Sequence, residues 1–368
     1  MKIRSSAVAL LCTLSSTSFA QSSSVTLFGT MDLGARYVKN GSLPAVKSEV
    51  SGSSATSKWG FRGVEDLGSG LSAGFHLEGG IGADTGTSNA ISPGQFWNRR
   101  STVSLASRTL GELRLGRDWA PTHNTWSGFD PFITLGVASA NTFRSGASRV
   151  LTQAFTAAGA AGGDPTLQVS NSIEYFLPAD LYGIYGNLTV SAGEGGTPAV
   201  GSSRATGFRL GYATGPVDVA AAMLDTKNAT GNNKFRDLVV GGSYDFGIVK
   251  VAVAQRRWSF VTDRQANTLL AASVPIGFGL LRVSYVKADQ SGATAALNAN
   301  DASLFGIGYL YNLSKRTAVY VQAARVSNRG AATFTVPGGA AVSATPSAAN
   351  YFGGQASTGA EFGLRHHF

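Results

Sequence analysis

The chain ends in Ala360-Glu361-Phe362-Gly363-Leu364-Arg365-His366-His367-Phe368, the stretch that decides its fold. Ala360, Phe362, Leu364 and Phe368 share one parity, whereas the charged Glu361 and Arg365 share the other. A period of two residues is the side-chain period of a β-strand. A strand that ends the chain on an aromatic residue is typical of the closing strand of a transmembrane β-barrel, with the ring in the interfacial region of the membrane.

The same period recurs along the chain. In the first such segment one face carries Leu27, Gly29, Met31, Leu33, Ala35 and Tyr37, and the other carries Thr26, Thr30, Asp32, Gly34 and Arg36. Further alternating runs cover residues 208–212, 249–254, 281–285 and 305–311. Short runs with strict alternation predict half-buried strands rather than helices. The core of a soluble β-sandwich gives the same pattern, so alternation alone leaves that fold open.

The connections between these runs differ in length. Seven are short and rich in turn-forming residues, at residues 66–70, 107–111, 178–180, 214–216, 246–247, 275–279 and 312–315. Between them lie eight longer polar stretches, near residues 39–56, 82–97, 119–168, 194–203, 227–235, 259–265, 290–301 and 328–356. Short turns on one side and long loops on the other predict an all-β, 16-stranded antiparallel transmembrane barrel, with both termini on the short-turn side. Sixteen strands are enough to enclose an aqueous channel.

The N-terminal residues have the pattern of a cleaved secretory signal peptide. Lys2 and Arg4 precede the apolar run Ala7 to Leu14, and Ser18-Phe19-Ala20 ends in a small-x-small cleavage pattern. The apolar run is too short for a membrane-spanning helix. We therefore expect residues 1–20 to be removed and residues 21–368 to form the barrel. The only cysteine is Cys12, so an exported mature chain would contain no disulfide.

Composition agrees with one barrel domain. The 47 glycines are spread along the chain, and no run of 18 or more apolar residues follows the N-terminus. The net charge of +9 falls to +7 without Lys2 and Arg4. A basic chain of this size is also compatible with nucleic-acid binding, but export argues against it. No zinc-ligand spacing, nucleophile-elbow motif or phosphate loop occurs, so we expect neither an enzyme nor a cofactor or metal site.

Five blocks together resemble the trimeric general porins of Gram-negative bacteria, in particular their β-proteobacterial branch. They are Ser24-Val25-Thr26-Leu27-Phe28-Gly29, the run Trp59 to Gly68, Arg99 to Leu105, Gly111 to Asp118 and Gly363 to Phe368. The resemblance covers the whole mature chain. It implies an outer-membrane homotrimer of sixteen-stranded barrels, each with its third outer loop folded into the lumen, through which small hydrophilic solutes diffuse passively.

The third outer loop corresponds to residues 119–168, the longest connection in the chain. A loop of this length without strands is usually functional or disordered. It carries aromatic residues that can pack on an inner wall: Trp119, Trp126, Phe129, Phe132 and Phe143. We expect it to be the constriction, with Asp118 and Asp130 as its acidic residues. The alternative is an ordinary surface loop.

Parity predicts which charged residues point into the barrel. If the large apolar residues face lipid, the inward basic residues are Arg36, Lys58, Arg62, Arg100 and Arg114. Arg117 breaks this parity, and only the resemblance places it at the constriction. Such a basic wall favours anions in a narrow pore. The alternative is that these cations pair with Glu78, Glu112 and Asp32 to brace the wall.

Two other functions remain open for a chain of this kind: a barrel enzyme with an acid/base pair at its rim, and a surface adhesin or receptor that uses the outer loops. Basic residues near the outer strand ends are also expected to contact outer-membrane lipid and lipopolysaccharide. These are Lys39, Lys47, Lys227 and Arg236.

Overall fold

The computed structural model describes residues 24–88, 95–155, 165–193, 204–228 and 230–368. The predicted signal peptide, residues 1–20, lies outside these ranges. The strands are β1 (Ser24–Asn40), β2 (Val46–Ser51), β3 (Lys58–Gly68), β4 (Leu71–Gly82), β5 (Thr87–Ser88), β6 (Arg100–Ser107), β7 (Gly111–Trp119), β8 (Gln168–Phe176), β9 (Ile184–Ser191), β10 (Ala205–Thr214), β11 (Val217–Lys227), β12 (Lys234–Asp245), β13 (Lys250–Phe260), β14 (Asp263–Ile276), β15 (Gly279–Ser291), β16 (Ala302–Asn312), β17 (Thr317–Asn328) and β18 (Ala356–His367). The helices are α1 (Pro121–Phe129), α2 (Arg149–Phe155) and α3 (Ala295–Asn298).

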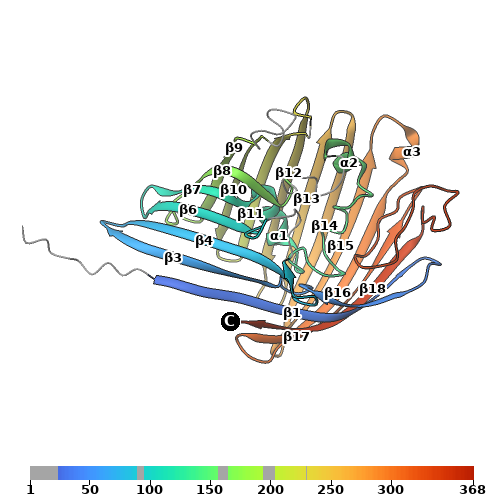
Figure 1. The fold of residues 1–368 in the computed structure, drawn as a ribbon, viewed down its shortest axis with the longest axis horizontal. Helices are drawn as coiled ribbons and strands as arrows, with labels where there is room; N and C mark the ends of the chain where they lie inside the picture. Colours follow the sequence, from blue (N-terminus) through green and yellow to red (C-terminus); the bar gives the residue numbers. More distant parts are fainter. Residues whose placement is uncertain (1–23, 89–94, 156–164, 194–203, 229) are drawn as a thin grey trace, which may run out of the picture.

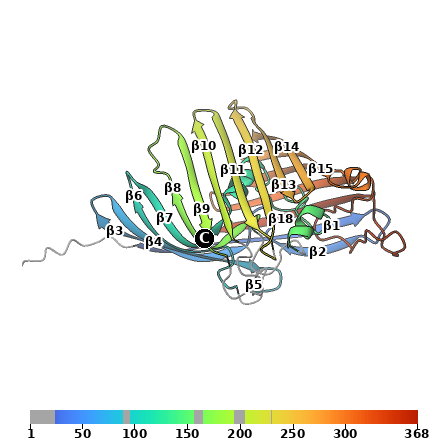
Figure 2. The ribbon, with the colours of Figure 1, turned by 90° about the horizontal axis from the view of Figure 1, so that it is seen from above.

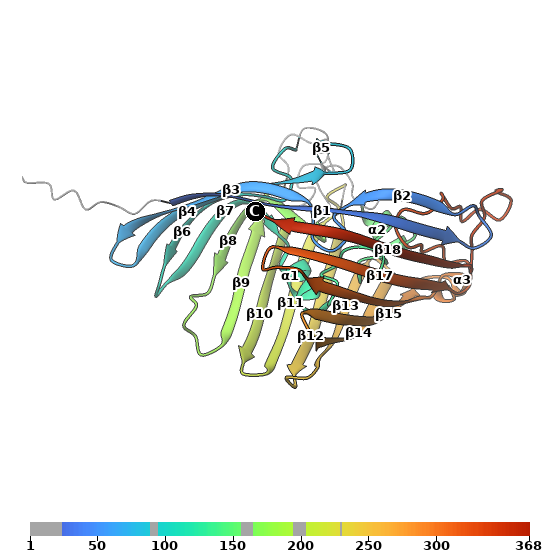
Figure 3. The same ribbon diagram turned by 90° about the horizontal axis from the view of Figure 1, so that it is seen from below.

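The strands form one closed antiparallel wall (Figure 1). β2 and β3 pair with successive halves of β1 and together make a single wall strand. β5 pairs only with the tip of β4 and is set apart from the wall (Figure 2). Of the eighteen strands in the described residues, β2 and β3 count as one wall strand and β5 is not part of the wall. Sixteen wall strands remain, as the sequence predicted. The barrel closes where β18 pairs with β1, from Thr30↔His367 to Asn40↔Ser357 (Figure 3).

The predicted asymmetry of connections is present with one exception. All seven short turns join neighbouring strands where the sequence placed them. The stretch 259–265 was expected to be a longer loop, but β13 and β14 continue through it and leave only a two-residue turn at Val261 and Thr262. Val261 adopts a φ of 54° there. The polar residues of this stretch lie on two long strands and alternate between the inner and outer faces of the wall. Their polarity was therefore not evidence of a loop.

Each wall strand has an apolar outer face and a polar inner face. On β1 the outward Leu27 and Tyr37 are 56% and 42% exposed, whereas the inward Asp32 is fully buried. The same division holds on β18, where Phe362 and Leu364 are exposed and Glu361 is buried. An outer-membrane barrel needs this alternation, because lipid covers one face of every strand and the lumen the other.

Two loops pack against the inner face. We call residues 120–167 loop 3 and residues 329–355 loop 8. A side chain at Gly241 of β12 or Gly308 of β16 would collide with Phe129 or Phe132 of loop 3, so these glycines allow the loop to lie close to the wall. Loop 8 was not predicted to turn inward, yet its Phe334 packs edge-to-face on Phe143 of loop 3 with ring centroids 5.1 Å apart.

Helix α1 organises the start of loop 3. Proline at its first position suits a helix N-terminus, because the missing N–H has no partner there in any case. The helix runs along the inner side of β10 to β13 (Figure 1). Among the residues described, no helix is long and apolar enough to cross a membrane.

Candidate functional site

A cavity of about 980 Å³ lies between loop 3 and the inner face of β1 and β3. Four basic side chains contribute to its lining: Lys58, Arg62, Arg99 and Arg144. Across the described ranges, no aspartate or glutamate lines it. In a confined space, an excess of positive charge in the lining produces a potential that attracts anions.

Lys58 and Arg99 are both held by one acid beneath the surface. Lys58 Nζ lies 3.1 Å from Oε2 of Glu78, and Arg99 Nε lies 2.6 Å from Oε1. His76 Nε2 is 3.5 Å from the same carboxylate. Glu78 is buried, so it fixes the two cations in position and offsets only part of their charge.

Arg62 is the most open of the predicted basic residues. Its side chain is exposed, and its guanidinium lies over the ring of Phe28 at 5.5 Å from the centroid. It makes no ion pair with any acid in the described part of the chain. A solute in the cavity would therefore meet the charge of Arg62 with little compensation.

An aromatic stack joins this cavity to loop 3. The guanidinium of Arg99 lies 4.8 Å from the centroid of the Trp119 ring, which stacks on His123 at 5.0 Å. Burial, with the positive charges of Arg256, Arg144 and Arg99, holds the pKa of His123 well below its usual value. His123 is therefore neutral at physiological pH.

Arg36 faces inward as predicted, but its charge is largely compensated. Its Nε donates to Oε2 of Glu361 at 2.6 Å, and a second nitrogen donates to Ser53 Oγ at 3.0 Å. The other oxygen of Glu361 accepts the Val137 N–H of loop 3 at 2.9 Å. Glu361 therefore joins the wall, the residues between β2 and β3, and loop 3.

Arg100 and Arg114 also face inward and share acids. Arg114 donates to Glu112 at 2.9 Å and to Asp118 at 2.5 Å, and Arg100 Nε lies 3.4 Å from the same Asp118 oxygen. Asp118 belongs to the end of β7 and is 3% exposed. It lies within the wall rather than on the loop, and it compensates the arginines that were expected to face it across the channel.

Arg117 occupies an irregular position. The pairing of β7 with β8 shifts register between Gly116 and Asp118, which accounts for the broken parity of Arg117. The side chain is buried, and it donates to the Asn98 carbonyl at 2.8 Å and to Ser170 Oγ at 2.6 Å. Arg117 does not contribute to the lining of the basic cavity.

Asp130 lies inside loop 3 and organises it. Its carboxylate accepts the backbone N–H groups of Phe132, Thr134 and Ala140 at 2.9–3.0 Å. Burial raises the pKa of Asp130, although these hydrogen bonds act in the opposite direction. The structure thus places Asp130 as the centre of a turn, away from the lining of the cavity.

Two further arginines hold loop 3 against the wall. The fully buried Arg256 on β13 donates to Asp237 at 2.6 Å and to the Thr166 carbonyl at 2.8 Å. Arg282 on β15 donates to the Pro131 carbonyl at 3.3 Å and lies over the Phe132 ring. Inward parity could have identified both, but nothing local indicates that a loop 90 or more residues away covers them.

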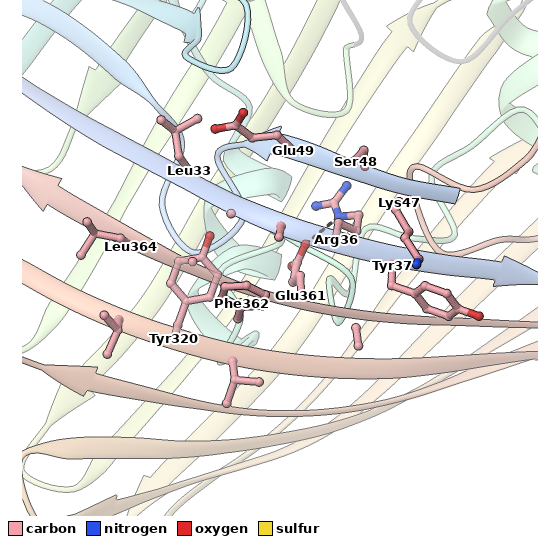
Figure 4. A pocket seen from close by; sticks show the side chains of 16 residues that line it. Leu33, Arg36, Tyr37, Lys47, Ser48, Glu49, Tyr320, Glu361, Phe362 and Leu364 are labelled. Atoms are coloured by element: carbon pink, nitrogen blue, oxygen red, sulfur yellow. Dashed lines mark hydrogen bonds and ion pairs between the residues drawn. The ribbon is translucent and has the colours of Figure 1, made fainter. Parts of the chain in front are cut away.

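A concavity on the outside of the barrel is mainly apolar. Leu33, Tyr37, Phe362 and Leu364 surround a groove of about 1050 Å³ on β1, β2, β17 and β18 (Figure 4). Arg36 and Glu361 belong to the same strands but form their ion pair on the opposite face. This groove is separate from the channel interior.

Comparison with known proteins agrees with this architecture. The chain matches the Gram-negative porin family over residues 7–331. It is 32% identical to outer membrane porin protein 32 of Delftia acidovorans, with 100% of both chains covered. It is 28% identical to major outer membrane protein P.IB of Neisseria meningitidis serogroup B, covering 84% of this chain and 90% of that one.

Among solved structures, the anion-selective porin from Comamonas acidovorans superimposes with a TM-score of 0.77 at 30% identity, covering 94% of this chain and 100% of that one. OmpT of Vibrio cholerae, solved in a trimer form, shares the fold at a TM-score of 0.62 and 12% identity. A closed sixteen-stranded barrel, an inward polar face and family similarity over most of the chain lead to one assignment: the chain belongs to the Gram-negative porin family and is an outer-membrane protein.

Proposed function

We propose that this porin carries small hydrophilic solutes passively and prefers anions. The observation that supports the preference is the cavity whose described lining contains Lys58, Arg62, Arg99 and Arg144 but no aspartate or glutamate. Solutes follow their gradient, so no catalytic step is needed. The anion selectivity named for the Comamonas acidovorans porin agrees with this proposal.

Loop 3 is proposed as the element that narrows the channel. Its residues pack on inward-facing positions of β12, β16 and β18, through Phe129, Phe132 and Val137. Because the segment is anchored at several points, it has the rigidity that a size limit requires. The aromatic residues bind it to the wall, while its polar edge, including Asn124 and Ser127, lines the cavity.

A homotrimer is proposed as the assembled state. The outer face near β3 carries an aromatic cluster of Trp59, Phe61, Phe96 and Trp97, with ring centroids 4.8–6.4 Å apart. A rigid apolar surface of this kind suits contact between subunits. An unheated gel sample that runs at monomer mass, together with crosslinking that yields only monomer, would contradict this state.

The charge preference is tested by measuring the reversal potential of single channels in a salt gradient. Replacing Arg62 and Arg99, two arginines of this lining, together with glutamine should shift selectivity toward cations at low salt. The shift should shrink in 1 M salt, where the Debye length is only about 3 Å. An unchanged reversal potential at low salt would show that these arginines do not set the preference.

The size limit is tested by shortening loop 3. Removing about ten residues around Asp130 should widen the channel, raise conductance and admit larger solutes. The barrel should still assemble, because the wall is closed by its own strand pairing. Shortening changes the cost of loop closure only slowly. An assembled variant with the conductance and size cutoff of the parent would refute the role of loop 3. Hydrolytic activity in the purified protein would contradict the passive mechanism.

A further inference from the structure

The basic cavity has an apolar side that a small inorganic anion does not need. Phe28, Trp119, Ile133, Leu135 and Leu167 line it together with the four basic residues. Its volume of about 980 Å³ is in the range of sites that hold small organic molecules. A lining that combines positive charge with apolar side chains is complementary to an anion with an apolar body.

Ile133 is the most unusual residue of this lining. Its φ is 48° and that of the following Thr134 is 61°, in the left-handed region that β-branched residues rarely adopt. The Ile133 side chain is 46% exposed, so packing inside loop 3 does not account for its conformation. Strained residues of this kind persist only where the surrounding structure enforces them, and they cluster at functional sites.

Asp130 enforces the conformation of Ile133. Its carboxylate accepts the N–H groups of Phe132 and Thr134, the two neighbours of Ile133, at 2.9–3.0 Å. Its carbonyl accepts the Ile133 N–H itself at 2.8 Å. Three hydrogen bonds to one residue therefore offset the strain and keep an apolar side chain at the surface of a positively charged cavity.

Two of the basic side chains already lie over aromatic rings. The guanidinium of Arg62 is 5.5 Å from the centroid of Phe28, and that of Arg99 is 4.8 Å from the centroid of Trp119. Arg99 also donates to Glu78, whereas the exposed Arg62 has no ion pair among the described residues. Because guanidinium groups stack on aromatic faces, one that covers a ring on one side can receive a second flat ring on the other.

We propose that the cavity preferentially binds aromatic carboxylates. This inference rests on the anion preference proposed above and names the class of anion. The carboxylate is attracted by the basic lining, the ring stacks on the guanidinium of Arg62, and the edge of the ring contacts Ile133. Conduction requires binding that is weak enough for release, so these solutes are carried through the channel rather than trapped.

The experiment measures how strongly an added anion reduces the chloride current through single channels of the purified, assembled protein in planar bilayers. The probes are benzoate, cyclohexanecarboxylate and acetate, all ionised at about pH 8. Benzoate should bind about tenfold more tightly than acetate, because part of its ring leaves water. It should bind roughly two- to fivefold more tightly than cyclohexanecarboxylate, whose puckered ring has no π face for the guanidinium.

Ile133→Thr tests the apolar contact and keeps the branched β-carbon. It should weaken benzoate binding about fourfold, the effect of roughly one buried methylene. The matched control is Val64→Thr, because Val64 is 53% exposed on the inner face of β3 but lies outside the described lining of the cavity. This control should bind benzoate like the parent.

Ile133→Gly guards against misfolding, because glycine adopts a positive φ without strain. It should assemble, as shown by unheated gel migration, and weaken benzoate binding at least as much as Ile133→Thr.

Three results would each overturn the proposal: benzoate binding no tighter than acetate, equal binding of benzoate and cyclohexanecarboxylate, or parental benzoate binding in both Ile133 variants. The reversal potential of the parent in a potassium chloride gradient is measured alongside. A parent that prefers chloride but fails one of these comparisons keeps the proposed function and loses only the aromatic specificity. A parent without a preference for chloride would contradict both.

Discussion

Arginines on two sides of the same barrel interior have different environments. On β3 the exposed Arg62 faces the cavity over Phe28, without an acid beside it in the described chain. On β13 the fully buried Arg256 donates hydrogen bonds to Asp237 and to the Thr166 carbonyl of loop 3. Both residues have inward parity on a wall strand. The difference shows that loop 3 covers one part of the inner wall and leaves another part open to the cavity.

The largest effect is expected from removing the anchor. Arg256→Ala leaves Asp237 buried beside loop 3 without its cation, and breaking such a pair costs about 3–5 kcal/mol. The free energy of unfolding should fall by that amount in guanidinium titrations of the detergent-solubilised protein. In the control Arg256→Met/Asp237→Leu no charge remains buried, so most of the loss should be recovered. If the free energy of unfolding of Arg256→Ala lies within 1 kcal/mol of that of the parent, the ion pair does not hold the loop.

An intermediate effect is expected from pH. His123 has a pKa well below 6.5 in the folded protein, because burial and nearby arginines disfavour its charged form. Below pH 6.5 the unfolded chain binds a proton that the folded chain does not, so this stability is present above pH 6.5 and is lost as pH falls. The loss approaches about 1.4 kcal/mol per pH unit while His123 stays neutral.

The measurement compares unfolding at pH 8 and pH 5 in the parent and in His123→Gln. The parent should lose up to about 2 kcal/mol more than the variant, which has no titrating group at this position. Equal pH dependence in the two proteins would show that His123 is accessible to protons in the folded state.

The smallest effect on stability, with a clear effect on transport, is expected at the solute-facing side. Arg62→Gln should leave the free energy of unfolding unchanged within about 0.5 kcal/mol, as is usual for exposed positions. Selectivity should shift toward cations in 0.1 M salt, where the Debye length is about 10 Å. Arg257→Gln, which removes the same charge from the outer face, should not change the reversal potential. If the two variants give equal shifts, the side of the wall does not matter and the comparison fails.

The features predicted correctly from the sequence are those that depend only on a residue's position along its own strand. Strand parity placed Arg36, Lys58 and Arg62 on the inner face, and the alternation at the C-terminus predicted the closing strand. These features depend on the two-residue period of a strand and on the need for an apolar face toward lipid. A local pattern is sufficient for them.

The compensation of charge could not be predicted in the same way. The roles of Asp118 and Asp130 depend on a register shift in β7 and on a turn within loop 3. The contact of Glu361 with Val137 joins residues 224 apart in the chain. Strand parity predicts whether a side chain faces outward or inward, but contacts with loop 3 decide which inward charges stay exposed.

The pairing of β18 with β1 also constrains when the barrel can form. Phe368 exchanges both backbone hydrogen bonds with Gly29, and Thr30 contacts His367 across 337 residues of chain. Contacts of such long range are slow to form, because the entropy of the intervening chain is lost before they form. Until the last residues arrive, the first strand keeps an unpaired edge, which is a template for aggregation. The final strand therefore completes the wall, and a chain that lacked it would leave the edge of β1 unpaired and the barrel open.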